Sequence, residues 1–458
     1  MSSALLENLA NVDAGGCPAP FIGESLYPYR GGFYGGRNCA PNPLVDASDT
    51  GNVSRCCIPC PVFDYVYDDH FHGQSDGAAW ANVAGFILCG ILLISYAALP
   101  AKVTRRSFLN IILLIGIMML ELGFIIPLGQ QPEQCFDPVT PNGMRSSATC
   151  AAGGGFATFG GMALVSWVLV RALFMHLQIC WSIVPDRTYY IAANVAVWSI
   201  TIALTSAVLA HVGVSFRFGG YCHVNVGSIS TYWAWLVAFA GISLLLQLAT
   251  FAYCLQVYIS AAFAGRQQLT AGSNKSGSMS GTTQSRNARI TARRVWKVLA
   301  LQWRSLAIVM IAIFTTALVC VVFMVYDDKL TQEAFVNTDA LIPWILCIIE
   351  FQDNSRCLNL TGPIILPQKL AVVTLYFLGF VGIEAFLLLF RVAFMKSWLD
   401  LLRTPFWKKK AKRSTWTGER DATPHTTPRR GNAVRGEEID GGDETSTEAT
   451  NESSKEQV

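Results

Sequence analysis

The chain has 458 residues, of which 52% are hydrophobic and only 14% are charged. Soluble domains average about 25% charged residues, so this composition excludes an ordinary soluble protein. The net charge of +3 is too small to indicate a nucleic-acid partner. Apolar runs of about 20 residues are long enough to cross a lipid bilayer, and such runs account for the composition. We therefore expect an integral membrane protein.

The first predicted domain is the segment 1–77, which precedes any membrane-spanning run. Its start has neither the basic residues nor the apolar core of a cleavable signal peptide, so we expect the first span to insert the chain. The segment contains the sequence SRCCIPCP at 54–61. Cysteines at this spacing could bind zinc if His70 and His72 supplied the remaining ligands, or they could form disulfides.

Seven apolar runs follow, and each is long enough to span a bilayer. They are 78–100, 108–128, 156–180, 189–211, 230–262, 297–326 and 370–397. A backbone in lipid must satisfy its own hydrogen bonds, so each run should be helical. The second predicted domain, 78–397, is thus an all-α bundle of seven transmembrane helices. A shorter apolar stretch, 341–349, contains Pro343, and we expect a loop segment packed against the bundle.

Lysine and arginine residues near the ends of the spans predict the orientation. They gather in the links after the first and fifth spans and after the seventh, whereas the links 129–155 and 212–229 hold only Arg145 and Arg217. This bias predicts a multi-pass protein with the N-terminus outside and the C-terminus inside. The basic residues expected to face a cytoplasmic partner are Arg105, Arg106, Arg187, Arg293, Arg294 and Lys297, although topology alone would also place them there.

In this topology ten of the fourteen cysteines lie outside. They are Cys17, Cys39, Cys56, Cys57, Cys60, Cys135, Cys150, Cys222, Cys347 and Cys357. An oxidising compartment favours disulfides over zinc, so we predict up to five bridges and no metal site. The sequence leaves the pairing open, but position favours Cys150 with Cys222 and Cys347 with Cys357. Sequons at Asn52 and Asn359 also fall outside, where they are candidate glycosylation sites.

Two features of the inner face are compositional. Residues 265–285 are rich in Gly, Ser and Thr and predict a flexible linker between the fifth and sixth spans. The third predicted domain, 398–458, begins with an amphipathic stretch that we expect to form an interfacial helix stopped by Pro405. The polar tail from Thr415 onward is expected to be disordered.

Ionisable residues inside predicted spans mark a candidate site, because burying them is costly. Those singled out as switch candidates are Glu121, Arg171, Arg304, Glu384 and Arg391. Glu121 and Glu384 each lie 13 residues from the inner end of a predicted span, which is about 20 Å at the helical rise. Arg171 is placed to reach either carboxylate. We expect Arg171 to pair with one of them at rest and to change partner on activation, or else to hold helices together as a static pair.

Four stretches resemble fungal seven-helix G-protein-coupled receptors, a group placed beside the secretin-like and cAMP-receptor-like families and also described as Frizzled/Smoothened-like. They are CCIPCPVFDYVY (56–67), FGGYCHVN (218–225), LVAFAGISLLLQLATFAYCLQVYI (236–259) and RRVWKVLALQWRSLAIV (293–309). The resemblance covers roughly residues 50–325. It implies a receptor of the plasma membrane, without a cofactor, that passes an extracellular signal to a heterotrimeric G protein, with the sixth helix as the moving element.

The chain departs from other receptor families in several places. The third span ends HLQICWSI, without an acidic-Arg-Tyr motif, and the seventh lacks Asn-Pro-x-x-Tyr. The first domain is too small for a full Frizzled cysteine-rich domain. Lys369 and Lys396 are terminal in the seventh span, which excludes a retinal Schiff base at its centre.

The alternative function is a membrane transporter or channel, which would predict internal repeats and helices broken at matching positions. The sequence shows no such repeat. A membrane enzyme is not expected either, since the sequence contains no HExxH or GxSxG motif. The chemistry of the ligand is not readable from the sequence.

Overall fold

The computed structural model describes residues 3–42, 55–104, 107–271, 303–304, 306–324, 342–361 and 366–403. The chain divides into two units, Met1–Leu399 and Asp400–Val458, and almost everything described belongs to the first. Several predicted features lie outside the described residues: the tail, most of the linker, and Asn52, Arg105, Arg106, Arg293, Arg294 and Lys297.

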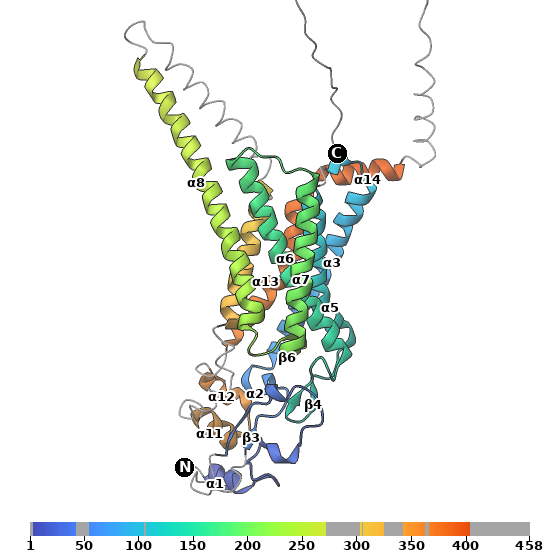
Figure 1. Cartoon of the computed structure of the whole chain (residues 1–458). Coiled ribbons are helices and arrows are strands. Elements are labelled where there is room, and N and C mark those ends of the chain that lie inside the picture. Colours follow the sequence, from blue (N-terminus) through green and yellow to red (C-terminus); the bar gives the residue numbers. More distant parts are fainter. Residues whose placement is uncertain are drawn as a thin grey trace, which may run out of the picture. The chain divides into compact units, whose positions relative to one another are not determined.

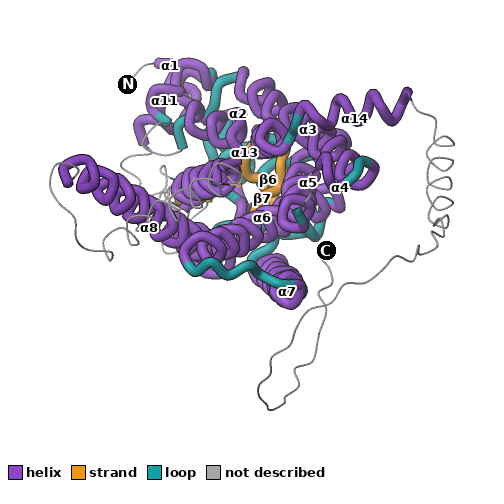
Figure 2. The backbone as a smooth tube through the Cα atoms, turned by 90° about the horizontal axis from the view of Figure 1, so that it is seen from above, coloured by secondary structure: helices purple, strands orange, loops and turns teal. Residues whose placement is uncertain are grey.

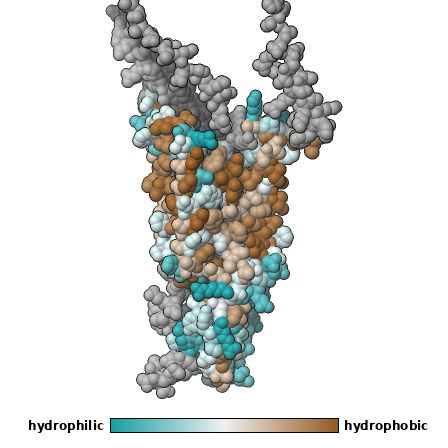
Figure 3. Space-filling model, turned by 45° about the vertical axis from the view of Figure 1, so that its right-hand side comes forward, coloured by the Kyte–Doolittle hydropathy of each residue, from teal (hydrophilic) through white to brown (hydrophobic). Residues whose placement is uncertain are grey.

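Seven helices of the described chain are long and apolar enough to cross a membrane, as predicted. They are α3 (His70–Ala98), α5 (Phe108–Gln130), α6 (Ala148–Cys180), α7 (Arg187–His211), the span Ile229–Val257, which joins a π turn to α8 (Ala234–Ala271), the helix Leu306–Met324, hereafter the sixth span, and α13 (Gln368–Leu389). They run side by side as one bundle (Figure 1). Large apolar side chains remain exposed along the helices, and they form a hydrophobic belt (Figure 3).

Capping residues define where several helices begin. The side chains of Ser107, Ser147 and Asp186 each accept a hydrogen bond from a backbone N–H three residues later. These bonds satisfy backbone donors that the first helical turn leaves unpaired. Within the bundle the most extensive packing joins α5 to α6 and α3 to α13. The two helices that carry Glu121 and Glu384 are thus each paired with a different neighbour.

The helix boundaries differ from the sequence prediction at both ends of the bundle. The first helix begins at His70 rather than 78, because an apolar run measures the thickness of a bilayer and not the length of a helix. The seventh ends at Leu389 rather than 397, and α14 (Val392–Arg403) follows it. Phe390 between them is extended, and its carbonyl oxygen accepts a hydrogen bond from Arg304 Nη1 at 2.9 Å.

The stretch expected as a loop at 341–349 is instead a helix, α11 (Ile342–Phe351), and the loop prediction was wrong. Pro343 lies in the first turn of α11. A proline there does not break a helix, because backbone N–H groups in the first turn have no intrahelical partner. α11 packs against α1 (Ser3–Ala10) near one end of the bundle.

The segments at this end form small, cross-linked elements. A three-stranded antiparallel sheet has the order β1 (Ile22–Gly23), β3 (Arg55–Cys57), β2 (Cys39–Pro41). Two hairpins join β4 (Cys135–Asp137) to β5 (Thr140–Pro141) and β6 (Val214–Phe218) to β7 (Tyr221–Val224). The same end of the bundle also contains short helices: η1 (Glu24–Leu26), η2 (Tyr34–Gly36), α2 (Phe63–Val66), α12 (Asn354–Cys357) and η6 (Leu358–Leu360).

Five disulfides tie these elements together, and we call this the disulfide end of the bundle. They are Cys17–Cys56, Cys39–Cys57, Cys60–Cys135, Cys150–Cys222 and Cys347–Cys357. All ten predicted cysteines are paired, and the two pairs favoured by position are both present. Cys57 and Cys60, the candidate zinc ligands, are both disulfide-bonded. Four cysteines inside helices are free: Cys89, Cys180, Cys254 and Cys320.

Candidate functional site

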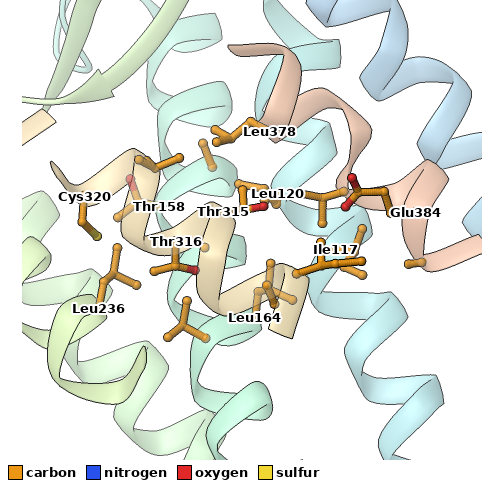
Figure 4. A pocket seen from close by; sticks show the side chains of 18 of the residues that line it. Ile117, Leu120, Thr158, Leu164, Leu236, Thr315, Thr316, Cys320, Leu378 and Glu384 are labelled. Carbon is orange, nitrogen blue, oxygen red and sulfur yellow. The ribbon is translucent and has the colours of Figure 1, made fainter. Parts of the chain in front are cut away.

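A pocket lies inside the bundle, and the empty space in it and at its opening, open solvent included, amounts to about 940 Å³. Its walls come from α5, α6, β7, the start of the fifth span, the sixth span and α13. The sixth span contributes the largest share, from Ile308 to Cys320. Most of the lining is aliphatic, for example Ile117, Leu164 and Leu236 (Figure 4).

Few polar groups face this pocket, and some of them are already bonded. Thr158 Oγ1 donates to Gly154 O at 2.7 Å, and the Tyr232 hydroxyl lies 3.5 Å from Thr158 O. By contrast, Thr315 Oγ1 and Glu384 Oε2 are buried atoms with no hydrogen-bond partner among the described residues. They come from two helices, the sixth span and α13, and both line the pocket (Figure 4). A ligand that bonded these two oxygens would supply the partner that each one lacks.

The β6–β7 hairpin lies across the centre of the ring of helices (Figure 2), and its residue His223 lines the pocket. The Cys150–Cys222 disulfide fastens it to the start of α6, and the Tyr221 hydroxyl donates to Ser75 O of α3 at 2.6 Å. The hairpin is therefore fixed to two helices by contacts outside the pocket.

The His223 ring of this hairpin packs against two other rings at the pocket wall, and these two also contact each other. Its centroid lies 4.3 Å from that of Phe323 on the sixth span and 5.4 Å from that of Trp233 at the start of the fifth. Burial and the nearby Arg217 guanidinium lower the pKa of His223 to about 3. The imidazole is therefore neutral at ordinary pH, and the stack joins three elements without an added charge.

Glu121 lies outside this pocket, at a junction of α5, α3 and α13. Its side chain is fully buried, and neither carboxylate oxygen has a hydrogen-bond partner among the described residues. The carboxyl group fits between Gly85 of α3 and Gly382 of α13, where a Cβ atom on either glycine would overlap it. Glu121 is thus enclosed by two helix backbones, which approach closely because both positions are glycine.

The structure places the predicted switch residues in separate positions. The Glu121 carboxyl is level with Gly382, so it lies at nearly the same depth as Glu384, as expected. However, two residues on a helix differ by roughly 200° in direction, so Gly382 and Glu384 face opposite sides of α13. Neither carboxylate forms an ion pair with any described residue. The expected pairing of Arg171 with one of them is therefore absent from this conformation.

The arginines lie instead near the end of the bundle opposite the disulfides. Arg171 is buried on α6, and both Arg171 and Arg391 interact electrostatically with Tyr96 of α3. Arg304 bonds the Phe390 carbonyl between α13 and α14 and lies over the Trp303 ring at 5.5 Å. The three arginines thus lie where α3, α6, the residues just before the sixth span and the α13–α14 break come together.

The remaining described candidates are on the surface. Arg187 is exposed at the first residue of α7, and Asn359 is exposed in η6. Thr315 and His223 were not predicted. A threonine in an apolar run and a histidine in a loop have no sequence signal that separates a pocket residue from an ordinary one.

Comparison with curated proteins shows a relative over most of the chain. The chain is 36% identical over 399 residues to the G protein-coupled receptor gprM of Aspergillus fumigatus, covering 86% of this chain and 78% of that protein. No protein-family model matches. Among solved structures, squid rhodopsin aligns with 79% of this chain and 94% of its own at 11% identity and a TM-score of 0.43.

Proposed function

Because this chain belongs to the G-protein-coupled receptors, we propose that it receives its signal in the pocket lined by Thr315 and Glu384 and passes that signal to a heterotrimeric G protein at the opposite end of the bundle. The single observation that supports this assignment is that the sixth span reaches from the pocket to the opposite end of the bundle. This helix lines the pocket from Ile308 to Cys320, and just before it Arg304 contacts the α13–α14 break.

The proposed mechanism follows from that geometry. A ligand can shift the receptor only if it binds the active arrangement more tightly than the resting one. Contacts to Thr315 and to the apolar wall act directly on the sixth span. A change in the position of this helix also changes the Arg304–Phe390 bond, which connects the pocket to the end opposite the disulfides.

The proposed orientation places the disulfide end outside the plasma membrane. All five described disulfides occur there, and disulfides persist in oxidising surroundings. The opposite end, where Arg187 is exposed, would then meet the G protein in the cytoplasm. A positively charged inner surface suits this position.

Guanine-nucleotide exchange tests the proposed function. The full chain in lipid nanodiscs should accelerate exchange on at least one purified heterotrimer of a panel of Gα subtypes. Nanodiscs without receptor and receptor denatured by heat serve as controls. If folded receptor leaves the rate unchanged with every heterotrimer, coupling to a G protein is excluded and transport becomes the function to test.

A further inference from the structure

We propose that the ligand of the pocket is an extended, mainly hydrocarbon molecule whose one polar head donates a hydrogen bond to Glu384 and Thr315. This inference rests on the proposed receptor function, since it assigns a chemical class to the same site. It is carried by the extent of the pocket along the sixth span, by its largely apolar lining and by two buried oxygens without a partner among the described residues.

The pocket is long and apolar. Along the sixth span its wall extends from Ile308 to Cys320, which is about 18 Å at the helical rise. Trp233 and His223 close it at the disulfide end, and Leu388 lines it towards the other end. An extended apolar chain could lie along this wall and bury its surface against aliphatic side chains.

Unpaired polar atoms limit what the head group can be. Thr315 is 6% exposed, and its hydroxyl has no partner among the described residues. Glu384 Oε2 is in the same state, and Glu384 forms no ion pair with a described residue. When Glu384 is ionised its carboxylate only accepts hydrogen bonds, so a hydroxyl or an ammonium fits beside it, whereas a ligand carboxylate would meet a like charge.

The same reasoning excludes strongly polar ligands. A sugar or a peptide backbone carries many donors and acceptors, and each one left unpaired in an apolar pocket opposes binding. Polar side chains are few in the described lining, so most of the polar groups of such a ligand would lose their water without gaining a partner. The pocket therefore selects against them.

The test is equilibrium binding of labelled 1-dodecanol and dodecylamine to the full chain in nanodiscs, with dodecanoate and glucose as comparison compounds. The variant Thr316→Phe places a ring in the pocket and serves as the background. Subtracting its binding signal from that of the unsubstituted chain removes the contribution of probe that has partitioned into the lipid. We expect saturable binding of the alcohol or the amine and none of the carboxylate or glucose. The alcohol and amine arms distinguish the two head groups.

Matched variants identify the binding atoms. Thr315→Val should weaken binding about tenfold by removing one hydrogen bond. Thr205→Val, which removes an equally unpartnered buried hydroxyl outside the pocket, should not. Glu384→Gln should weaken dodecylamine about tenfold or more, since it removes a charge-assisted bond. Glu121→Gln should leave binding unchanged, because Glu121 does not line the pocket. Thermal unfolding confirms that each variant is folded.

Two results would overturn the ligand class: no saturable binding of either dodecyl compound, or equal binding by Thr315→Val, Glu384→Gln and the unsubstituted chain. Failure of the receptor function is distinguishable, because binding is measured without G protein. If the probes bind but no heterotrimer responds, the pocket assignment stands and coupling fails. If exchange is catalysed but no probe binds, the receptor stands and the ligand class fails.

Discussion

At the scale of single residues, the enclosed carboxyl group of Glu121 gives the sharpest expectation. A Cβ atom at position 382 would overlap Glu121 Oε1 and approach the Gly85 backbone. Gly382→Ala should therefore destabilise the receptor by about 1–3 kcal/mol, the usual effect of overpacking. Thermal unfolding in nanodiscs measures the change. Gly90→Ala on α3 is the matched control, because nothing lies within 4 Å of the added methyl group.

The second residue-scale prediction concerns pH. The pKa of His223 is lowered from 6.5 to about 3 in the folded protein, so below pH 6.5 the unfolded chain binds more protons. The contribution of His223 to the free energy of unfolding is fully present above pH 6.5. It falls by about 1.4 kcal/mol per pH unit as the pH decreases towards 3.

Denaturation midpoints measured between pH 7 and pH 4 should show this loss. His223→Phe keeps a ring against Trp233 and Phe323 but cannot take up a proton, so its pH dependence should be correspondingly smaller. Identical pH profiles for the two proteins would show that the stacked imidazole is not the titrating group.

At the scale of elements, the disulfides should differ in strength. Cys150–Cys222 closes a separation of 72 residues and Cys347–Cys357 one of 10. Loop entropy predicts losses of about 4 and about 3 kcal/mol when each pair is replaced by serine. Chemical denaturation of both variants tests the order. Cys180→Ser, at a free and partly buried thiol, is the control. A larger loss from the shorter loop would contradict the entropic explanation.

The number of membrane-spanning helices was predictable from the sequence, but one short helix and one helix boundary were not. Seven apolar runs identified seven helices, because a bilayer requires both length and internal hydrogen bonding. The α11 prediction failed because a proline in the first turn of a helix does not break it, whereas a proline inside a helix can. The break after Leu389 was missed because Phe390 is extended where its carbonyl accepts a hydrogen bond from Arg304, a residue distant in sequence.

At the scale of the whole molecule, the Arg304–Phe390 bond is the proposed link between the sixth span and the α13–α14 break. Arg304→Leu removes the donor and should release the sixth span, raising basal nucleotide exchange per folded receptor. Arg304→Lys keeps a cationic donor and serves as the control. Exchange normalised to the amount of folded receptor is the measurement, and rates equal to the unsubstituted chain in both variants would exclude this link.

The sequence by itself determined the membrane class, the seven helices and the set of paired cysteines, because these depend on composition, run length and compartment. Only the tertiary structure decided which charged residues meet. Glu121 and Glu384 have nearly equal depth, yet they lie on opposite sides of α13, because the direction of a helical side chain depends on rotation about the axis as well as on height. The pocket was decided in the same way, since Thr315 and Glu384 become its free oxygens only through the packing of two helices that are separate in sequence.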